Sequence, residues 1–177
     1  FEDNVYEAAL NAKVLDRYLL EQLKTDLENI KPMKAVFDKK YVKNIDGPNI
    51  KTANSKMDLA EQLMQDMADF KKNNNCDRLV IVWCASTEAY IEASDVHMSL
   101  EAFEEGLKNN DERIAPSMIY AYAALKLGIP FANGAPNLTC DIPAMLELSH
   151  ITHTPIAGKD CKTGQTLMKT IVAPGLH

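Results

Sequence analysis

The sequence contains no apolar run close to the roughly 20 residues that a membrane-spanning helix requires. Its N-terminus is acidic and amphipathic, whereas a signal peptide is basic and then apolar. The chain also has no excess of positive charge, because its net charge is -6 and its isoelectric point is near 5.2. Such a charge gives no electrostatic reason to bind nucleic acid or an anionic membrane. We therefore expect a cytoplasmic protein that binds neither nucleic acid nor membrane.

Closely spaced metal-binding and redox motifs are also missing. The four cysteines of the chain are Cys76, Cys84, Cys140 and Cys161. They form no CxxC pair, so their spacing indicates neither a structural zinc site nor a redox dithiol. We predict that all of them are reduced thiols. His150 and His153 are close in sequence, but no acid or cysteine nearby completes a ligand set, so we assign no metal site.

The N-terminal half has two helical patterns separated by an irregular segment. Apolar residues recur every three or four positions over residues 5–30, which predicts one long helix ending before Pro32. Residues 32–54 have turn residues and no period, and could hold a short strand at residues 35–37. Ser55 and Asp58 then form a capping box, which predicts the start of a second helix.

Helices and strands alternate in the remainder of the chain. Residues 79–84 form a continuous apolar run, which predicts a central parallel strand covered on both faces. The patterns predict further strands at residues 129–133 and 154–157, and helices at residues 100–108, 116–127 and 141–148. Such alternation is typical of an α/β fold with a doubly wound parallel sheet, whose ligands bind beyond the carboxyl ends of the strands.

Small and polar residues follow each of the three predicted strands, at positions 85–88, 133–137 and 158–166. We expect these segments to gather at one rim of the sheet, where they could approach a ligand closely. The third segment looks like a phosphate-binding loop, but Gln165 rather than Lys follows Gly164, so we reject that motif. Loops of this composition are common in α/β proteins, and each segment alone is therefore weak evidence.

Four segments together carry a resemblance to a known family. They are LVIVWCASTEAY at residues 79–90, IAPS at 114–117, GIPFANGAP at 128–136 and GKDCKTGQT at 158–166. In this order and spacing they resemble the signature segments of myo-inositol-phosphate synthases. The resemblance covers essentially the whole chain, although residues 38–54 match poorly. It implies that residues 1–165 are the C-terminal part of a Rossmann-like NAD-binding domain, and that residues 166–177 begin a second, α+β domain for catalysis and tetramerisation.

The resemblance also implies which residues bind the cofactor NAD. It places Cys84, Ala85 and Ser86 along the NAD pocket, with Gly134 against the dinucleotide. It places Asp160, Cys161 and Thr163 at the nicotinamide end. Lys162 lies beside them, and we take Asp160 and Lys162 as the candidate catalytic residues. Where the family usually has G-D-D, this chain has a lysine, Lys159, in place of the first acid, so only Asp160 can take a carboxylate role there.

The family's reaction, as the resemblance implies it, converts glucose 6-phosphate to myo-inositol phosphate. NAD oxidises the substrate, enolisation and an intramolecular aldol reaction close the ring, and NADH then reduces the ketone. This chain has neither the family's Gly-rich turn nor its later lysine-bearing segments. Lys162 and Lys169 match lysines of the third segment itself, and we do not equate them with the later lysines. We expect the chain to be inactive alone, and the full-length enzyme to be a homotetramer.

Two alternatives remain open at this point. The protein could be a generic NAD-dependent dehydrogenase, which would form NADH in proportion to its product. It could also be a non-enzymic nucleotide-binding or assembly module, if the complete protein lacks the later lysines. Glu88, which follows the first predicted strand, could hydrogen-bond near the pocket, but capping a helix or facing solvent is its simpler use.

Overall fold

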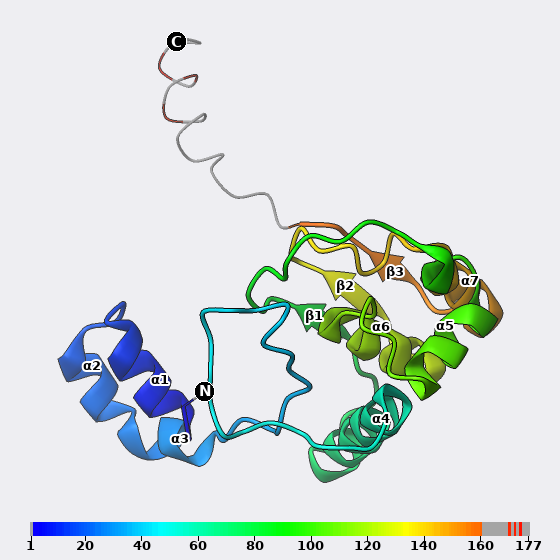
Figure 1. The fold of residues 1–177 in the computed structure, drawn as a ribbon. Helices are drawn as coiled ribbons and strands as arrows, with labels where there is room; N and C mark the ends of the chain where they lie inside the picture. The colour runs from blue at the N-terminus through cyan, green and yellow to red at the C-terminus, as the bar shows by residue number, and fades with distance from the viewer. Residues whose placement is uncertain (1, 161–169, 171, 173, 175–177) are drawn as a thin grey trace.

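The computed structural model describes residues 2–160, 170, 172 and 174 (Figure 1). Its centre is a parallel sheet with the strand order β1-β2-β3. The strands are β1 (Ile81–Trp83), β2 (Phe131–Asn133) and β3 (Ile156–Ala157). Ile81 pairs with Phe131, and Phe131 pairs in turn with Ile156. Because the strands are parallel and helices connect them, their carboxyl ends face the same side, and the predicted α/β architecture is confirmed.

The first strand departs from its prediction in one respect. Among the described residues, β1 pairs only with β2, so it lies at an edge of the sheet rather than at its centre. Val80 and Val82 are 63% and 56% exposed, so one face of this segment is open to solvent. Ile81 and Trp83 pack against the core on the other face. The prediction that both faces are covered is therefore wrong for the described part of the chain.

The helices beside the sheet are α4 (Lys56–Asn73), α5 (Leu100–Lys108), α6 (Pro116–Lys126) and α7 (Pro143–Thr152). The predicted capping box at the start of α4 is confirmed, because the Ser55 hydroxyl accepts the Asp58 N–H and the Asp58 carboxylate accepts the Ser55 N–H. Pro116 occupies the first turn of α6, and Gly128 follows its end with a φ of +68°. Helix α7 continues beyond Leu148, where the sequence predicted its end.

The hydrophobic core forms around α6, which packs against α4, α7 and β2. Large buried side chains from α5, α6 and α7 are Phe103, Leu107, Met118, Ile119, Met145 and Leu148. Burial of each such side chain stabilises the fold by about 1.5–3 kcal/mol. Trp83 and the methionine-rich α4 also contribute to the core, because Trp83 packs on Tyr120 with ring centroids 5.2 Å apart and Met67 is buried.

The N-terminal region is broken into short helices where the sequence predicted one long helix. They are α1 (Val5–Ala12), α2 (Arg17–Gln22) and α3 (Lys24–Asn29), which pack on one another and stand apart from the sheet (Figure 1). Lys13 ends α1 in the left-handed conformation, with a φ of 54°. The Asp16 carboxylate then accepts the N–H groups of Tyr18 and Leu19 and starts a new helix. The apolar spacing continues across this break, so periodicity alone did not reveal it.

Residues 32–54 form the irregular segment that the sequence predicted. The short strand considered at residues 35–37 is reduced to a single parallel bridge between Ala35 and Ile50. Lys51 continues the contact by donating its N–H to the Ala35 carbonyl at 2.8 Å. The Lys51 ammonium also forms an ion pair with Asp66 of α4 at 2.8 Å, which holds the segment against that helix.

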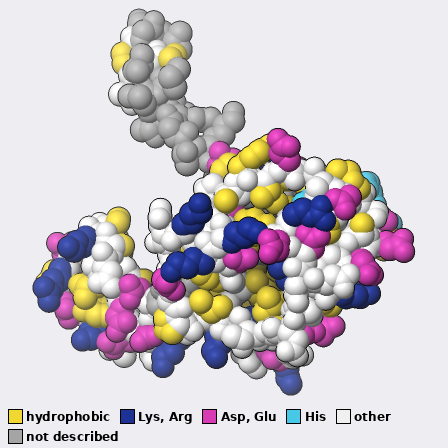
Figure 2. All heavy atoms as spheres, in the orientation of Figure 1, with side chains coloured by type: hydrophobic (Ala, Val, Ile, Leu, Met, Phe, Trp, Pro, Cys, Tyr) yellow, Lys and Arg dark blue, Asp and Glu magenta, His cyan; other side chains and the backbone are white. Residues whose placement is uncertain are grey.

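Basic and acidic side chains are interspersed on the face of the molecule that Figure 2 shows. Ion pairs of the described residues include Lys39 with Asp46 at 2.6 Å and Lys126 with Glu104 at 3.2 Å. In the described part of the chain, no helix is both long enough and apolar enough to cross a membrane.

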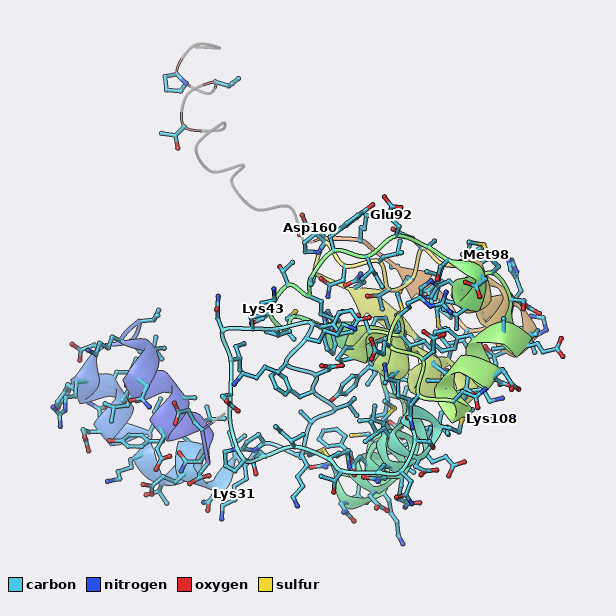
Figure 3. All side chains as sticks on the ribbon, viewed as in Figure 1. Lys31, Lys43, Glu92, Met98, Lys108 and Asp160 are labelled. Atoms are coloured by element: carbon cyan, nitrogen blue, oxygen red, sulfur yellow. The ribbon has the colours of Figure 1, made fainter. Side chains whose placement is uncertain are left out.

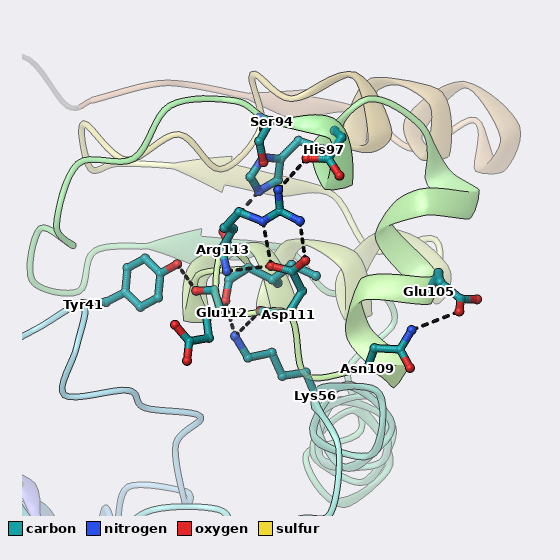
Figure 4. Close-up of polar contacts among 11 residues, drawn as sticks. Tyr41, Lys56, Ser94, His97, Glu105, Asn109, Asp111, Glu112 and Arg113 are labelled. Atoms are coloured by element: carbon teal, nitrogen blue, oxygen red, sulfur yellow. Dashed lines mark hydrogen bonds and ion pairs between the residues drawn. The ribbon is translucent and has the colours of Figure 1, made fainter.

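A polar cluster holds the loop between α5 and α6 (Figure 4). Nδ1 of the buried His97 ring accepts the Ser94 N–H at 3.0 Å. The ring proton is therefore on Nε2, which lies 3.1 Å from the Arg113 carbonyl oxygen. The Arg113 guanidinium pairs with Asp111 at 2.6 Å, and Lys56 donates to the Asp111 carbonyl at 2.8 Å. Burial lowers the pKa of His97, so the fold holds this ring in its neutral form.

This histidine gives a testable pH dependence. Because the folded-state pKa of His97 lies below the unfolded value of about 6.5, the stability it contributes is complete above about pH 6.5 and is lost as the pH falls through the folded-state pKa. We expect His97→Gln to flatten the decline of unfolding free energy below about pH 6.5, measured by urea denaturation. The exposed His150 is the control, and an equal flattening by His150→Gln would contradict this account.

Candidate functional site at the carboxyl ends of the strands

The turns that follow the strands lie side by side at one edge of the sheet. We define the first turn as residues 84–89, the second as 134–139 and the third as 158–160. Gly134 donates its N–H to the Trp83 carbonyl at 2.9 Å, which joins the second turn to the end of β1. Asp160 donates its N–H to the Ala135 carbonyl at 3.2 Å, which joins the third turn to the second. The predicted gathering at one rim is therefore present for the described part of these segments, which ends at Asp160.

Asp160 has an exposed side chain at this rim, on the same side of the molecule as Glu92 (Figure 3). Its backbone is left-handed, with a φ of 67°. The other candidate residues of the third segment, Cys161, Lys162 and Thr163, lie outside the described residues. Lys159, which stands where the family usually has an acid, pairs with Asp141 at 2.8 Å, and this hydrogen bond raises the pKa of Lys159.

A close backbone approach brings the third turn against the second. Gly158 has a φ of +137°, and a Cβ at this position would lie 2.8 Å from both the Cβ and the carbonyl oxygen of Asn133. Only glycine fits there without displacing β2. The buried Asn133 side chain also fixes the second turn, because it accepts the Ala135 N–H at 3.1 Å and donates to the Asn137 carbonyl at 3.0 Å.

A cleft opens beside the first turn. It consists of a cavity of about 370 Å³ and an adjoining cavity of about 410 Å³, which share Val42, Ile45, Ser86 and Glu88. Both volumes fall in the range of small-molecule pockets. The first cavity is lined by Ala35, Val36, Phe37, Val42, Ile45, Trp83, Cys84, Ala85, Ser86, Glu88, Pro116 and Tyr120. The predicted residues Cys84, Ala85 and Ser86 thus lie in the cleft wall, and each of them is exposed.

The opposite wall of the cleft comes from residues 35–45, which the sequence analysis did not connect with the site. The Tyr41 carbonyl accepts the Ala89 N–H at 2.8 Å. The Tyr41 hydroxyl donates to the Glu112 carbonyl at 2.7 Å. The Val36 N–H donates to the Tyr120 hydroxyl at 3.0 Å. Burial raises the pKa of Tyr41 to about 12, so its hydroxyl remains a donor at neutral pH. No periodic pattern marks this wall in the sequence, because the apolar residues of this segment fall in short clusters separated by Asp38, lysines and Asn44.

Glu88 joins the first turn to α6 and to the second turn. Glu88 is only 6% exposed. Its carboxylate accepts hydrogen bonds from the N–H of Ser117, at 2.8 Å, and from the Ser117 hydroxyl. The Ser117 hydroxyl in turn lies 2.8 Å from that of Thr139, and the Glu88 N–H donates to the Asn137 side chain at 3.0 Å. Burial raises the pKa of Glu88, and the hydrogen bonds from Ser117 oppose this shift. The helix-capping use of Glu88 that the sequence suggested is confirmed.

The chemistry of the cleft suits part of a dinucleotide. Apolar side chains on both walls can enclose a flat ring, while the Ser86 hydroxyl and the exposed backbone of the first turn can hydrogen-bond neutral groups. Within residues 2–160 and the few described positions beyond them, no group of three His, Cys, Asp or Glu side chains could hold a metal ion.

A parallel sheet whose strand-end turns meet at one edge, with a cleft beside the first of them, is typical of the Rossmann-like class of α/β proteins. The NAD-binding family model described as myo-inositol-1-phosphate synthase matches residues 1–175, and the chain belongs to that family. The resemblance seen in the sequence is thus confirmed, and NAD is the cofactor of the family.

Relatives and solved structures agree with this assignment. Inositol-3-phosphate synthase 1 of Bacteroides thetaiotaomicron is 54% identical over 98% of this chain and 41% of that protein. Inositol-3-phosphate synthase of Saccharomyces cerevisiae is 31% identical over 96% of this chain and 34% of that protein. The structure of inositol-3-phosphate synthase from Caenorhabditis elegans matches with a TM-score of 0.87 and 26% identity, over 98% of this chain and 36% of that one. The chain therefore spans about two fifths or less of these proteins.

The cysteines near the site should differ in reactivity. Cys84 is exposed in the cleft, whereas Cys140 is buried and its burial raises the thiol pKa to about 12. Because the thiolate is the reactive form, we expect iodoacetamide to label Cys84 in the native full-length protein and to leave Cys140 unmodified. Peptide mass spectrometry would measure both sites, with the unfolded protein as control. Equal labelling of the two cysteines in the native protein would contradict the geometry.

Proposed function

We propose that this chain is the C-terminal part of the NAD-binding domain of an enzyme that converts glucose 6-phosphate to myo-inositol phosphate. Its relatives are inositol-3-phosphate synthases, which supports the product class, and the family supports the cofactor. One structural observation carries the proposal. The turns after β1, β2 and β3 are joined at one rim by backbone hydrogen bonds, and the first of these turns forms a wall of a cleft of suitable size and chemistry.

In this proposal the chain's own residues hold and orient the cofactor. Cys84, Ala85 and Ser86 form one wall of the cleft, and Gly134 supports the dinucleotide from the second turn. Asp160 provides a carboxylate at the rim, at the nicotinamide end. The bound cofactor would supply reversible hydride transfer with no net oxidation, so the overall reaction would be an isomerisation.

Other parts of the proposal concern residues or properties beyond the described site. Cys161 and Thr163 would continue the cofactor contacts from Asp160, and Lys162 would be the second catalytic residue. We propose that residues 166–177 begin the catalytic and tetramerisation domain, and that the full-length enzyme is a cytoplasmic homotetramer. The chain alone would be inactive, because the phosphate-binding turn and the later lysines of the family belong to other segments.

NAD binding can be tested at Cys84. If the dinucleotide lies in the cleft, NAD should slow the alkylation of Cys84 in the full-length protein, because the bound cofactor covers this exposed thiol. Cys76 precedes β1, at the other end of the strand, and serves as the internal control. Peptide mass spectrometry would follow both rates at several NAD concentrations. Alkylation of Cys84 at the same rate with and without saturating NAD would contradict the proposed position of the cofactor.

The role of Asp160 can be tested by Asp160→Asn in the full-length enzyme. Asparagine tolerates the left-handed backbone at this position, so the variant removes the charge and keeps the conformation. We expect turnover to fall by about 100-fold or more, the loss typical of a removed acid or base. The assay supplies glucose 6-phosphate with NAD and measures inositol phosphate. The exposed Asp77, before β1, provides the control variant Asp77→Asn, and unchanged turnover in Asp160→Asn would overturn the assignment.

The same assay separates the synthase from a dehydrogenase. The synthase reaction regenerates NAD, so inositol phosphate should accumulate without net formation of NADH. A generic dehydrogenase would instead form one NADH for each product molecule. A non-enzymic module would give neither product nor NADH.

A further inference from the structure

We propose that Glu88 is a positioning residue for the NAD cleft, because it holds the first turn, α6 and the second turn in one fixed arrangement. This inference rests on the proposed function, since it takes NAD to be the occupant of the cleft. Glu88 lines both cavities of the cleft, but its carboxylate is bound to Ser117 rather than turned to a ligand. It would act through the backbone of the first turn, which carries Cys84, Ala85 and Ser86 into the cleft wall.

Glu88 is suited to this role because it connects segments that are far apart in the sequence. Its carboxylate binds Ser117, in the first turn of α6, through both the backbone N–H and the hydroxyl. Its own N–H is held by Asn137 of the second turn, and Thr139 of that turn reaches the same Ser117 hydroxyl. The side chain and backbone N–H of Glu88 therefore fix the position of the first turn relative to α6 and to the second turn.

The contacts of Glu88 favour a positioning role over direct binding. Both carboxylate oxygens accept hydrogen bonds from Ser117, one from its N–H and the other from its hydroxyl. A carboxylate so placed would repel the phosphates of a dinucleotide rather than attract them. Burial of this charge has a free-energy cost, which the two hydrogen bonds from the start of α6 offset. The contribution of Glu88 to the cleft is therefore geometric.

The hydroxyl groups beside Glu88 make a sharp test possible. With a carboxylate at position 88, Thr139 donates to Ser117 and Ser117 donates to Glu88. In Glu88→Gln the amide can donate to the Ser117 hydroxyl, which then rotates and donates to Thr139, while the amide oxygen still accepts the Ser117 N–H. The glutamine thus preserves the connection without the charge. In Glu88→Ala the connection is lost.

The experiment measures NAD affinity in the full-length enzyme carrying Glu88→Ala, Glu88→Gln or Ser117→Ala. We expect Glu88→Ala to raise the dissociation constant and the KM for NAD by about tenfold or more, as for the loss of charged hydrogen bonds, with a smaller change in the KM for glucose 6-phosphate. Glu88→Gln should stay within about twofold of the wild type. Ser117→Ala keeps the backbone N–H and should give an intermediate loss.

A matched control comes from the opposite side of α6. Glu104 of α5 accepts the Tyr122 hydroxyl at 2.8 Å and pairs with Lys126, so it joins two helices away from the cleft. Glu104→Ala should lower the thermal midpoint and leave the NAD dissociation constant unchanged. If Glu88→Ala behaved like Glu104→Ala, its role would be structural only, and the inference would be overturned. Equal losses of NAD affinity in Glu88→Gln and Glu88→Ala would also overturn it, because the charge would then matter.

A second readout does not depend on NAD. The rate of Cys84 alkylation in the cofactor-free protein reports how firmly the first turn is held, and Glu88→Ala should raise it several-fold while Glu88→Gln does not. If Glu88→Ala fails to fold, Ser117→Ala gives the same comparison. A wild-type protein that binds no NAD would refute the proposed function, and unaltered Cys84 alkylation in Glu88→Ala or Ser117→Ala would separately refute the positioning role.

Discussion

The pairing of β2 with both of its neighbours is the constraint on which the rest of the site depends. Parallel registry places the carboxyl ends of the strands together, and the bonds from Gly134 to Trp83 and from Asp160 to Ala135 continue this registry into the turns. Backbone hydrogen bonds thus make neighbours of segments that are distant in the sequence. The position of the rim is therefore a property of the backbone, and side chains determine what the rim can bind.

The cleft beside this rim is shaped by buried polar contacts rather than by the sheet alone. Tyr41 holds the outer wall to the first turn, and Glu88 holds the inner wall to α6. Each contact satisfies a polar group that would otherwise be costly to bury. A rigid cleft loses less conformational entropy when a ligand binds. The same contacts that stabilise the loops therefore prepare the cleft for a dinucleotide.

Much of the fold followed from the sequence, because its signals were local. The capping box at Ser55, the proline at the start of α6 and the apolar strand runs each act within a few residues. The break at Lys13, the edge position of β1 and the cleft wall at residues 35–45 depend on tertiary contacts that leave no periodic pattern. For the site, the turns were found from their composition and order, whereas the long-range bonds of Glu88 could only be seen in the structure.

We propose that the turns at the carboxyl ends of β1, β2 and β3 together receive the redox-active end of a dinucleotide. A crystal structure of the full-length protein with NAD would test this position of the cofactor. We expect density for the nicotinamide ribose between the first and third turns, within contact distance of Cys84 and Asp160. Cofactor density elsewhere, such as in the apolar groove that Phe70 and Val80 line beyond the amino end of β1, would contradict the account.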